Sequence, residues 1–358
     1  METLKKITAS PLFLPLFALA VLLIFNVIFV DGFLTIEMTD DGRLYGRLID
    51  ILNRSSSLII LALGMTFVIA TSGIDISVGS VIAISSAVCC TLIGGRGDGA
   101  AEYPMILAML AAVLAGVLCG VWNGLLVAKF KIQPVVATLI LMTAGRGIAQ
   151  LITEGQIITV YYKPFAYIGS SIPGNILPTT IFIAIAMILL VTFIIKKTSI
   201  GLFVQSVGIN PTASRFTGIN VTFVIFLVYA FSGFCAGVSG LIESSLIRAA
   251  DANNAGLNME MDAILAVALG GTLLSGGKFN IGGSVIGAIT IQTLTTTMYA
   301  LGVSSEQLPV IKAVAVIILC LMQSSKFRVM FNNWKSRNKV GPQGDKNFLM
   351  DEKAVNKA

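Results

Sequence analysis

The sequence contains no histidine, and only 12% of its 358 residues are charged. The side chain that most often shuttles protons and binds zinc is therefore missing. All five cysteines lie within apolar runs, where a free thiol behaves as a small hydrophobic residue. Their spacing fits neither a disulfide framework nor a metal site. We therefore expect no metal centre and no bound cofactor in this chain.

A nucleotide-binding loop is also missing from the sequence. The best candidate ends at Gly276, Gly277 and Lys278, but Thr272 replaces its first glycine and Phe279 replaces its final Ser or Thr. No nucleophile elbow or pair of catalytic carboxylates can be recognised. We expect a chain that is not an enzyme and has no ATPase site of its own.

Apolar residues are abundant instead: 56% of the chain is hydrophobic and the mean hydropathy is +0.90. A soluble domain has about 45–50% apolar and about 25% charged residues. No strand-like alternation recurs, so we predict an all-α fold, a polytopic membrane helix bundle of about ten transmembrane helices. The predicted spans are residues 11–30, 56–73, 76–93, 104–128, 134–152, 176–195, 221–243, 261–276, 282–300 and 307–323.

The distribution of Lys and Arg predicts the orientation. With the N-terminus inside, 16 of these residues fall in cytoplasmic segments and six in outer segments. This asymmetry favours an N-in/C-in topology, which requires an even number of spans. The first apolar run follows Lys5 and Lys6 but has no small-residue cleavage site, so we expect a retained span. Residues 1–325 are expected to form the membrane domain, and residues 326–358 a basic, flexible cytoplasmic tail.

A polar, basic stretch, Lys196 to Asn220, interrupts two long apolar runs. Asn210 precedes Pro211, so the chain is pushed out of a helix at Asn210 and can start a new one at Pro211. The pattern predicts a short surface helix, 211–217, that Gly218 stops. Such a helix between two spans is either an ordinary cytoplasmic loop or a contact for a partner in the water.

Two short segments near the second predicted span have distinctive patterns. Leu44, Leu48, Ile51 and Leu52 follow helical spacing and predict an amphipathic helix at the outer interface. The following break, TSGIDISVGS, holds Asp75 at membrane depth. A carboxylate there either caps the next helix with support from Ser77 or serves transport, and the cap is the expected role.

The same motifs occur twice along the chain. ALGMT (62–66) followed by VGSVI (78–82) returns as ALGGT (268–272) followed by GGSVI (282–286). Both copies run in the same direction through the ten predicted spans. This indicates a parallel internal repeat, which is common in transport proteins.

Small and polar residues suggest further contacts inside the bundle. Gly116, Gly120 and Gly124, and likewise Gly233 and Gly237, recur every four residues and predict close helix approach, within the chain or at a dimer seam. Two cations lie within predicted spans. Arg146 is expected to snorkel or to pair with Glu154, and Lys312 to snorkel at the outer end. The outer stretch from Arg248 to Gly256 suits either sugar hydroxyls or a tight turn.

Four motifs carry a resemblance to a known family: ALGMTFVIATSGIDISVGS (62–80), GVWNGLLVAKFKIQPVVATL (120–139), VGINPTASRFTGIN (207–220) and MDAILAVALGGTLLSGG (261–277). In this order they resemble the permease subunits of bacterial sugar ABC importers of the ribose type. DGRLYGRLIDILNR, LMTAGRGIAQLIT and ADANNAGL look particularly like permeases of galactofuranose importers.

The resemblance implies a transport complex in the bacterial plasma (inner) membrane. Its partners would be cytoplasmic ATPase subunits that use ATP and Mg, an extracytoplasmic sugar-binding protein and a second permease subunit, identical or paralogous. The lipid bilayer surrounds the chain, and no nucleic acid is implied. The family's ATPase-coupling helix falls on Gly208, Asn210, Pro211, Ala213 and Gly218.

Polar residues within and beside the spans are the pathway or gate candidates: Asp75, Asn123, Arg146, Arg248, Asp251, Asn253 and Asn254. Two alternatives stay open. One is a stand-alone transporter driven by protons or Na⁺, with Asp75, Glu154, Glu243 and Asp262 as ion sites. The other is the same permease class carrying another small ligand, such as a pentose, a nucleoside or a branched-chain amino acid.

Overall fold

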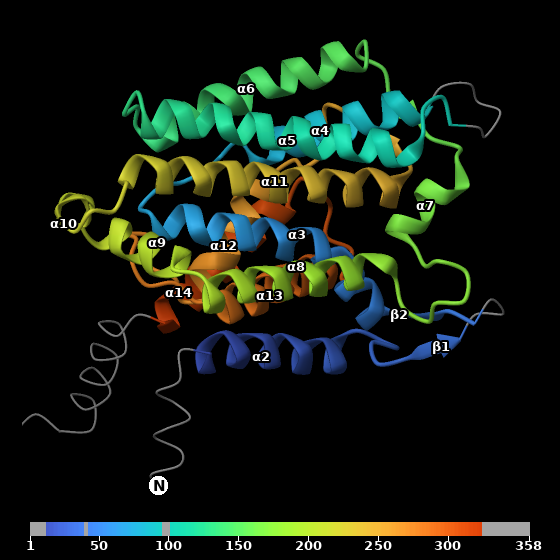
Figure 1. Cartoon of the computed structure of the whole chain (residues 1–358). Coiled ribbons are helices and arrows are strands. Elements are labelled where there is room, and N and C mark those ends of the chain that lie inside the picture. The colour runs from blue at the N-terminus through green and yellow to red at the C-terminus, as the bar shows by residue number, and fades with distance from the viewer. Residues whose placement is uncertain (1–11, 39–41, 95–100, 324–358) are drawn as a thin grey trace, which may run out of the picture. The chain divides into compact units, whose positions relative to one another are not determined.

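The computed structural model describes residues 12–38, 42–94 and 101–323 and is mostly helical (Figure 1). The chain divides into two compact units, Met1–Ser305 and Glu306–Ala358. The described part of the second unit is the helix α14 (Leu308–Gln323), and the predicted tail, 326–358, lies outside the described residues. The described helices of the first unit are α2 (Phe13–Phe29), α3 (Arg47–Ala70), α4 (Val78–Gly94), α5 (Met105–Ala128), α6 (Pro134–Ile152), α7 (Lys163–Gly169), α8 (Thr179–Lys197), α9 (Ile200–Ile209), α10 (Pro211–Phe216), α11 (Val221–Ile247), α12 (Met259–Leu269) and α13 (Ile281–Ala300).

Two short antiparallel sheets lie in the connections between helices. β1 (Ile36–Met38) pairs with β2 (Leu44–Gly46) between α2 and α3. β3 (Ile158–Thr159) pairs with β4 (Ala249–Ala250) and so joins the segments that follow α6 and α11. Both sheets hold together connections at one end of the bundle (Figure 1).

Five described helices are long and apolar enough to cross a membrane by themselves: α3, α5, α6, α8 and α11. The chain is therefore a polytopic helical membrane protein. The helix expected over 261–276 is wrong, because α12 has only 11 residues. At 1.5 Å per residue it is about 16 Å long, roughly half of the hydrocarbon thickness. It ends in a glycine C-cap: Gly271 has φ +85°, and the Thr272 amide donates to the Val267 carbonyl over 3.3 Å.

α3 forms the centre of the first unit. It packs against α8, α11, α12 and α13, and every residue from Ser55 to Ala70 is buried (Figure 1). A helix that is apolar on all sides belongs in such a position. The separate amphipathic helix expected near residue 48 is wrong: residues 44–46 form β2, and α3 begins at Arg47. Ile51 and Leu48 pack on Val30 and Phe33, just after α2, whereas Leu52 is 40% exposed. Part of this apolar face therefore covers protein.

The glycines of α5 and α11 bring these two helices into backbone contact. A Cβ at Gly120 would lie 2.3 Å from the carbonyl oxygen of Tyr229, and one at Gly233 would lie 2.3 Å from that of Gly116. Any larger side chain would therefore separate the helices. The seam lies within one chain, so these glycines do not form the alternative dimer seam.

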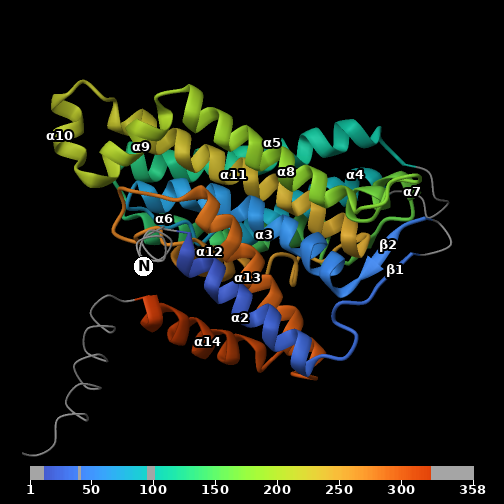
Figure 2. The ribbon, with the colours of Figure 1, turned by 90° about the horizontal axis from the view of Figure 1, so that it is seen from below.

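α13 connects the centre to the edge of the first unit. Figure 2 shows α2 beside α13, where the amide of Asn26 donates to the hydroxyl of Thr297 over 2.7 Å. At the other end of α13, residues from the two copies of the repeated motif contact each other: the Thr66 hydroxyl of α3 donates to Ser284 over 2.8 Å. Each copy has the order helix, break, helix: α3 and α4, then α12 and α13.

Candidate functional site

The basic stretch after α8 folds into two helices. α9 ends at Ile209, and Asn210 leaves the helical conformation with φ −156° and ψ 100°. Pro211 then begins α10, and the Asn210 side-chain oxygen accepts a hydrogen bond from the Ala213 amide over 3.0 Å. The short helix is confirmed, although it ends at Phe216, one residue earlier than predicted. Gly218, with φ +86°, follows it.

Sequence reasoning missed α9. The signal was present, because Gly201, Val204, Val207 and Gly208 are its buried residues and recur at helical spacing. In Figure 1, α10 lies at one end of the bundle beyond the end of α3. Apart from Ser214, its residues are exposed, so α10 presents almost its whole surface to the outside of the first unit.

The end of α9 packs tightly against the break between α3 and α4, residues 71–77. A Cβ at Gly208 would lie 1.8 Å from the carbonyl oxygen of Ala70. The Ser72 hydroxyl lies 3.1 Å from the Gly208 carbonyl oxygen and 2.8 Å from that of Ser275, and can donate to either. The Gly277 amide donates to Ala70 over 2.8 Å. The end of α9 and residues 275–277 therefore both contact Ala70 and Ser72 at the start of the break.

Asp75 is the centre of this break and is only 2% exposed. One carboxylate oxygen accepts from the Ser77 amide over 3.1 Å and from its hydroxyl over 2.6 Å. The other accepts from the Ser232 hydroxyl of α11 over 2.9 Å. Asn123 of α5 donates to the Ser77 hydroxyl over 2.8 Å. Asp75 thus holds the start of α4 against α5 and α11, and two predicted pathway residues, Asp75 and Asn123, come together.

Sequence reasoning did not find Ser232 or Tyr229, since both lie in the apolar run of α11. The Tyr229 hydroxyl is buried beside Gly73, where a Cβ would lie 2.6 Å from it. Within the described part of the chain, this hydroxyl and the Asn123 side-chain oxygen have no hydrogen-bond partner. The break therefore contains unpaired polar atoms beside a carboxylate.

A second group of predicted residues lies after α11. Asp251 accepts hydrogen bonds from the amides of Asn253 and Asn254, at 3.0 Å and 3.2 Å, and from the Asn254 side chain at 2.7 Å. The structure therefore shows a tight turn here, one of the two expectations for this stretch. Arg248 is exposed and contributes its main chain, whose carbonyl accepts from the Val160 amide over 2.8 Å.

Arg146 of α6 holds this turn inside the bundle. Its guanidinium donates to the carbonyl oxygens of Ala252, over 3.1 Å, and Ala255. Four residues further along α6, Gln150 donates to Asn253 over 2.6 Å. These contacts replace both snorkelling and the expected pairing with Glu154. The partners of Arg146 are backbone carbonyls more than 100 residues away, so no local pattern could have indicated them.

The non-helical segment after α11 also packs against the first turn of α4. A Cβ at Gly79 would lie 2.5 Å from the Gly256 carbonyl oxygen and 2.2 Å from a carboxylate oxygen of Glu260. Glu260 is 4% exposed, and its Oε2 has no hydrogen-bond partner among the described residues. α12 therefore begins inside the bundle. The segment from Asp251 to Gly256 and the break at Asp75 both reach the start of α4.

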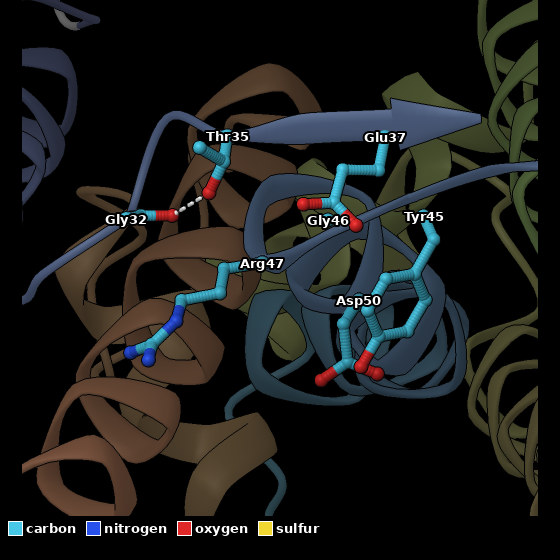
Figure 3. Close-up of a pocket in the computed structure, with 7 residues that line it drawn as sticks. All are labelled: Gly32, Thr35, Glu37, Tyr45, Gly46, Arg47 and Asp50. Carbon is cyan, nitrogen blue, oxygen red and sulfur yellow. Dashed lines mark hydrogen bonds between the residues drawn. The ribbon is translucent and has the colours of Figure 1, made fainter. Parts of the chain in front are cut away.

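A separate cavity of about 200 Å³ lies beside the β1–β2 hairpin (Figure 3). Its lining residues are Gly32, Thr35, Glu37, Tyr45, Gly46, Arg47 and Asp50. Figure 3 shows the Thr35 hydroxyl donating to the Gly32 carbonyl, and the Arg47 guanidinium directed away from the carboxylates of Glu37 and Asp50. None of the predicted coupling or pathway residues lines this cavity.

Comparisons with known proteins show which family the chain belongs to. Residues 47–322 match the family model described as "Branched-chain amino acid transport system / permease component". The galactofuranose transporter permease protein YtfT of Escherichia coli (strain K12) is 44% identical over 302 residues, 84% of this chain and 86% of that protein. The fructose import permease protein FruF of Bifidobacterium longum is 38% identical over 345 residues, 95% of each chain.

The ribose import permease protein RbsC of Escherichia coli (strain K12) is 34% identical over 284 residues, 78% of this chain and 86% of that protein. No solved structure matches the chain. The family model and these relatives all cover most of the helical unit described above. The chain therefore belongs to this family of transport-system permease components.

Proposed function

We propose that this chain is the transmembrane permease subunit of an ATP-binding-cassette importer for a monosaccharide, galactofuranose or a related sugar. The sugar permeases similar to it over most of their length support the substrate class. One observation carries the mechanism: α10 is a capped, exposed helix, and its neighbour α9 packs tightly against the break that contains Asp75. Such a helix suits a contact with a separate motor protein.

Coupling would pass from α10 through α9 to the α3–α4 break. Asn210, Pro211 and Ala213 shape the start of α10, and Gly218 ends it. Gly208 gives the contact with Ala70. Closure of the partner ATPase pair would push on α10 and move the break together with the start of α4. ATP and Mg would be used only in the partner, and this chain would bind no cofactor.

The pathway would run along the segment from Asp251 to Asn258 and past the start of α4. Non-helical backbone at membrane depth is tolerated where it is buried in protein or lines a water-filled cavity. Arg146 satisfies two carbonyls of this segment, while Asn253 and Asn254 offer amide groups to sugar hydroxyls. An extracytoplasmic binding protein would supply most of the sugar selectivity.

We also propose ten membrane crossings with both termini in the cytoplasm of a bacterium, in its plasma (inner) membrane. In this topology α12 and the preceding segment cross together as one discontinuous span. The parallel repeat is supported by the matching order of helix, break and helix in α3–α4 and α12–α13. The complex would contain a second permease subunit, identical or paralogous.

One observation favours a second candidate substrate. The description of the family model names branched-chain amino acids, whereas the relatives named above carry sugars. Binding measurements on the cognate binding protein decide between them. Galactofuranose bound more tightly than ribose, fructose or leucine supports the narrow proposal, and leucine bound most tightly contradicts it.

The mechanism is tested by reconstituting the permease with and without its ATPase in liposomes that contain the sugar-loaded binding protein. We expect uptake only with the ATPase and ATP. Uptake by the permease alone, driven by a proton or Na⁺ gradient, would establish the ion-coupled alternative instead. A catalytically dead ATPase is the matched control, because it keeps the complex assembled without hydrolysis.

A further inference from the structure

A cavity of about 400 Å³ lies between α8, α9 and the start of α13, at the end of the bundle that carries α10. Its lining residues are Ile188, Thr192, Ile195, Lys196, Gln205, Phe279, Asn280, Ile281, Gly282 and Val285. No predicted coupling or pathway residue is among them. Its volume falls in the range of small-molecule sites.

The cavity has one polar end and one apolar end. Lys196 in the last turn of α8 and Asn280 before α13 lie at the polar end. Ile188 lies eight residues earlier on α8, about 12 Å from Lys196 along the helix axis, and Val285 lies one turn inside α13. The cavity thus has the polarity of a membrane lipid, with its polar end at the end of the spans.

Charge favours an anionic headgroup. None of the described residues that line the cavity has a carboxylate, and the sequence has no Asp or Glu between Glu154 and Glu243 or between Asp262 and Glu306. Asn280 caps α13 through its side-chain oxygen. Its side-chain nitrogen is buried without a hydrogen-bond partner in the part of the chain described here. Because that nitrogen is buried, it does not face the cavity, and Lys196 is the charged group available to a phosphate oxygen.

The cavity also lies beside surface suited to lipid. The exposed face of α8 carries Ile185, Leu189 and Phe193, which are 47%, 63% and 62% exposed. A large apolar surface on a membrane helix is where acyl chains are expected. Ile188 and Thr192, which line the cavity, belong to the same helix beside this face.

We propose that the cavity between α8, α9 and α13 binds a phospholipid with an anionic headgroup. Its phosphate contacts Lys196, and the first part of one acyl chain lies along Ile188 and Val285. Gln205 belongs to α9, so the bound lipid steadies the helix that precedes α10. This last consequence rests on the proposed function, whereas the lipid site itself does not.

The experiment uses the whole importer complex in nanodiscs and measures bound phosphatidylglycerol against phosphatidylcholine by native mass spectrometry. Lys196→Gln is expected to weaken phosphatidylglycerol binding about fivefold, the effect of one lysine near an anionic headgroup. Lys197→Gln removes the same charge one residue away but does not line the cavity, so wild-type binding is expected.

Ile188→Trp fills the apolar end without changing the charge and is also expected to release the lipid. Its control, Ile185→Trp, places the same ring on the exposed face of α8. Equal losses in the two lysine variants, retention in Ile188→Trp, or equal binding of phosphatidylcholine would each overturn the proposal. Lipid binding is read without transport, so a complex that imports no sugar but shows the expected lipid pattern contradicts the proposed function alone.

Discussion

Replacing Gly208 by alanine tests the contact between the coupling segment and the bundle. The new Cβ would lie 1.8 Å from the Ala70 carbonyl oxygen and 2.6 Å from the Gly277 nitrogen. Real Cβ contacts are not shorter than about 3.0 Å, so α9 has to move by roughly 1.2 Å against rigid backbone. Such overpacking costs about 1–3 kcal/mol.

Gly201→Ala in the same helix is the matched control. Its Cβ would meet the side-chain methyl of Ile195 at 3.0 Å, which can rotate away. Both variants gain up to about 1 kcal/mol of helix propensity. The difference between them therefore measures the Gly208 contact alone.

The assay compares sugar uptake with ATPase stimulation by the loaded binding protein, at equal amounts of assembled complex. A coupling change of about 1–3 kcal/mol corresponds to roughly 5- to 150-fold. We expect Gly208→Ala to reduce uptake at least about fivefold, while Gly201→Ala stays close to wild type. Wild-type coupling in Gly208→Ala, or equal losses in both variants, would refute the transmission of force through this contact.

Three further substitutions test the other parts of the site. Asn210→Ala combined with Pro211→Ala removes the cap and first residue of α10, so we expect an inserted complex with reduced uptake; Asn220→Ala removes an equivalent cap from α11, over 3.0 Å, and should keep coupling. Unchanged uptake and ATPase stimulation in the double variant would count against the coupling role. Asp75→Asn weakens an acceptor of three hydrogen bonds, so reduced membrane abundance is expected on immunoblots, and normal abundance without uptake would point to a transport role instead. Arg146→Ala leaves two partly buried carbonyls without this donor, at up to about 1–3 kcal/mol each, so the complex should unfold at lower temperature, and an unchanged melting temperature would contradict the bracing role.

Short-range features of the chain were predicted well. Asn210, Pro211 and Gly218 set the limits of α10 through caps and backbone preferences that act within a few residues. Asp75 accepts from the Ser77 amide just before α4, as the local pattern indicated. The end of α12 was missed although its signal is also local: Gly271 takes φ +85° directly after the helix and forms a glycine C-cap.

The sequence by itself determined the class of the protein, since its low charge and long apolar runs leave a helical membrane bundle as the arrangement that satisfies backbone hydrogen bonds in lipid. Only the tertiary structure decided which polar groups meet. Arg146 with Ala252, Asp75 with Ser232 and Gly208 with Ala70 are pairs more than 100 residues apart. Such pairs depend on helix packing: a periodic glycine pattern can show that a helix approaches a neighbour closely, but not which residue of which helix it meets.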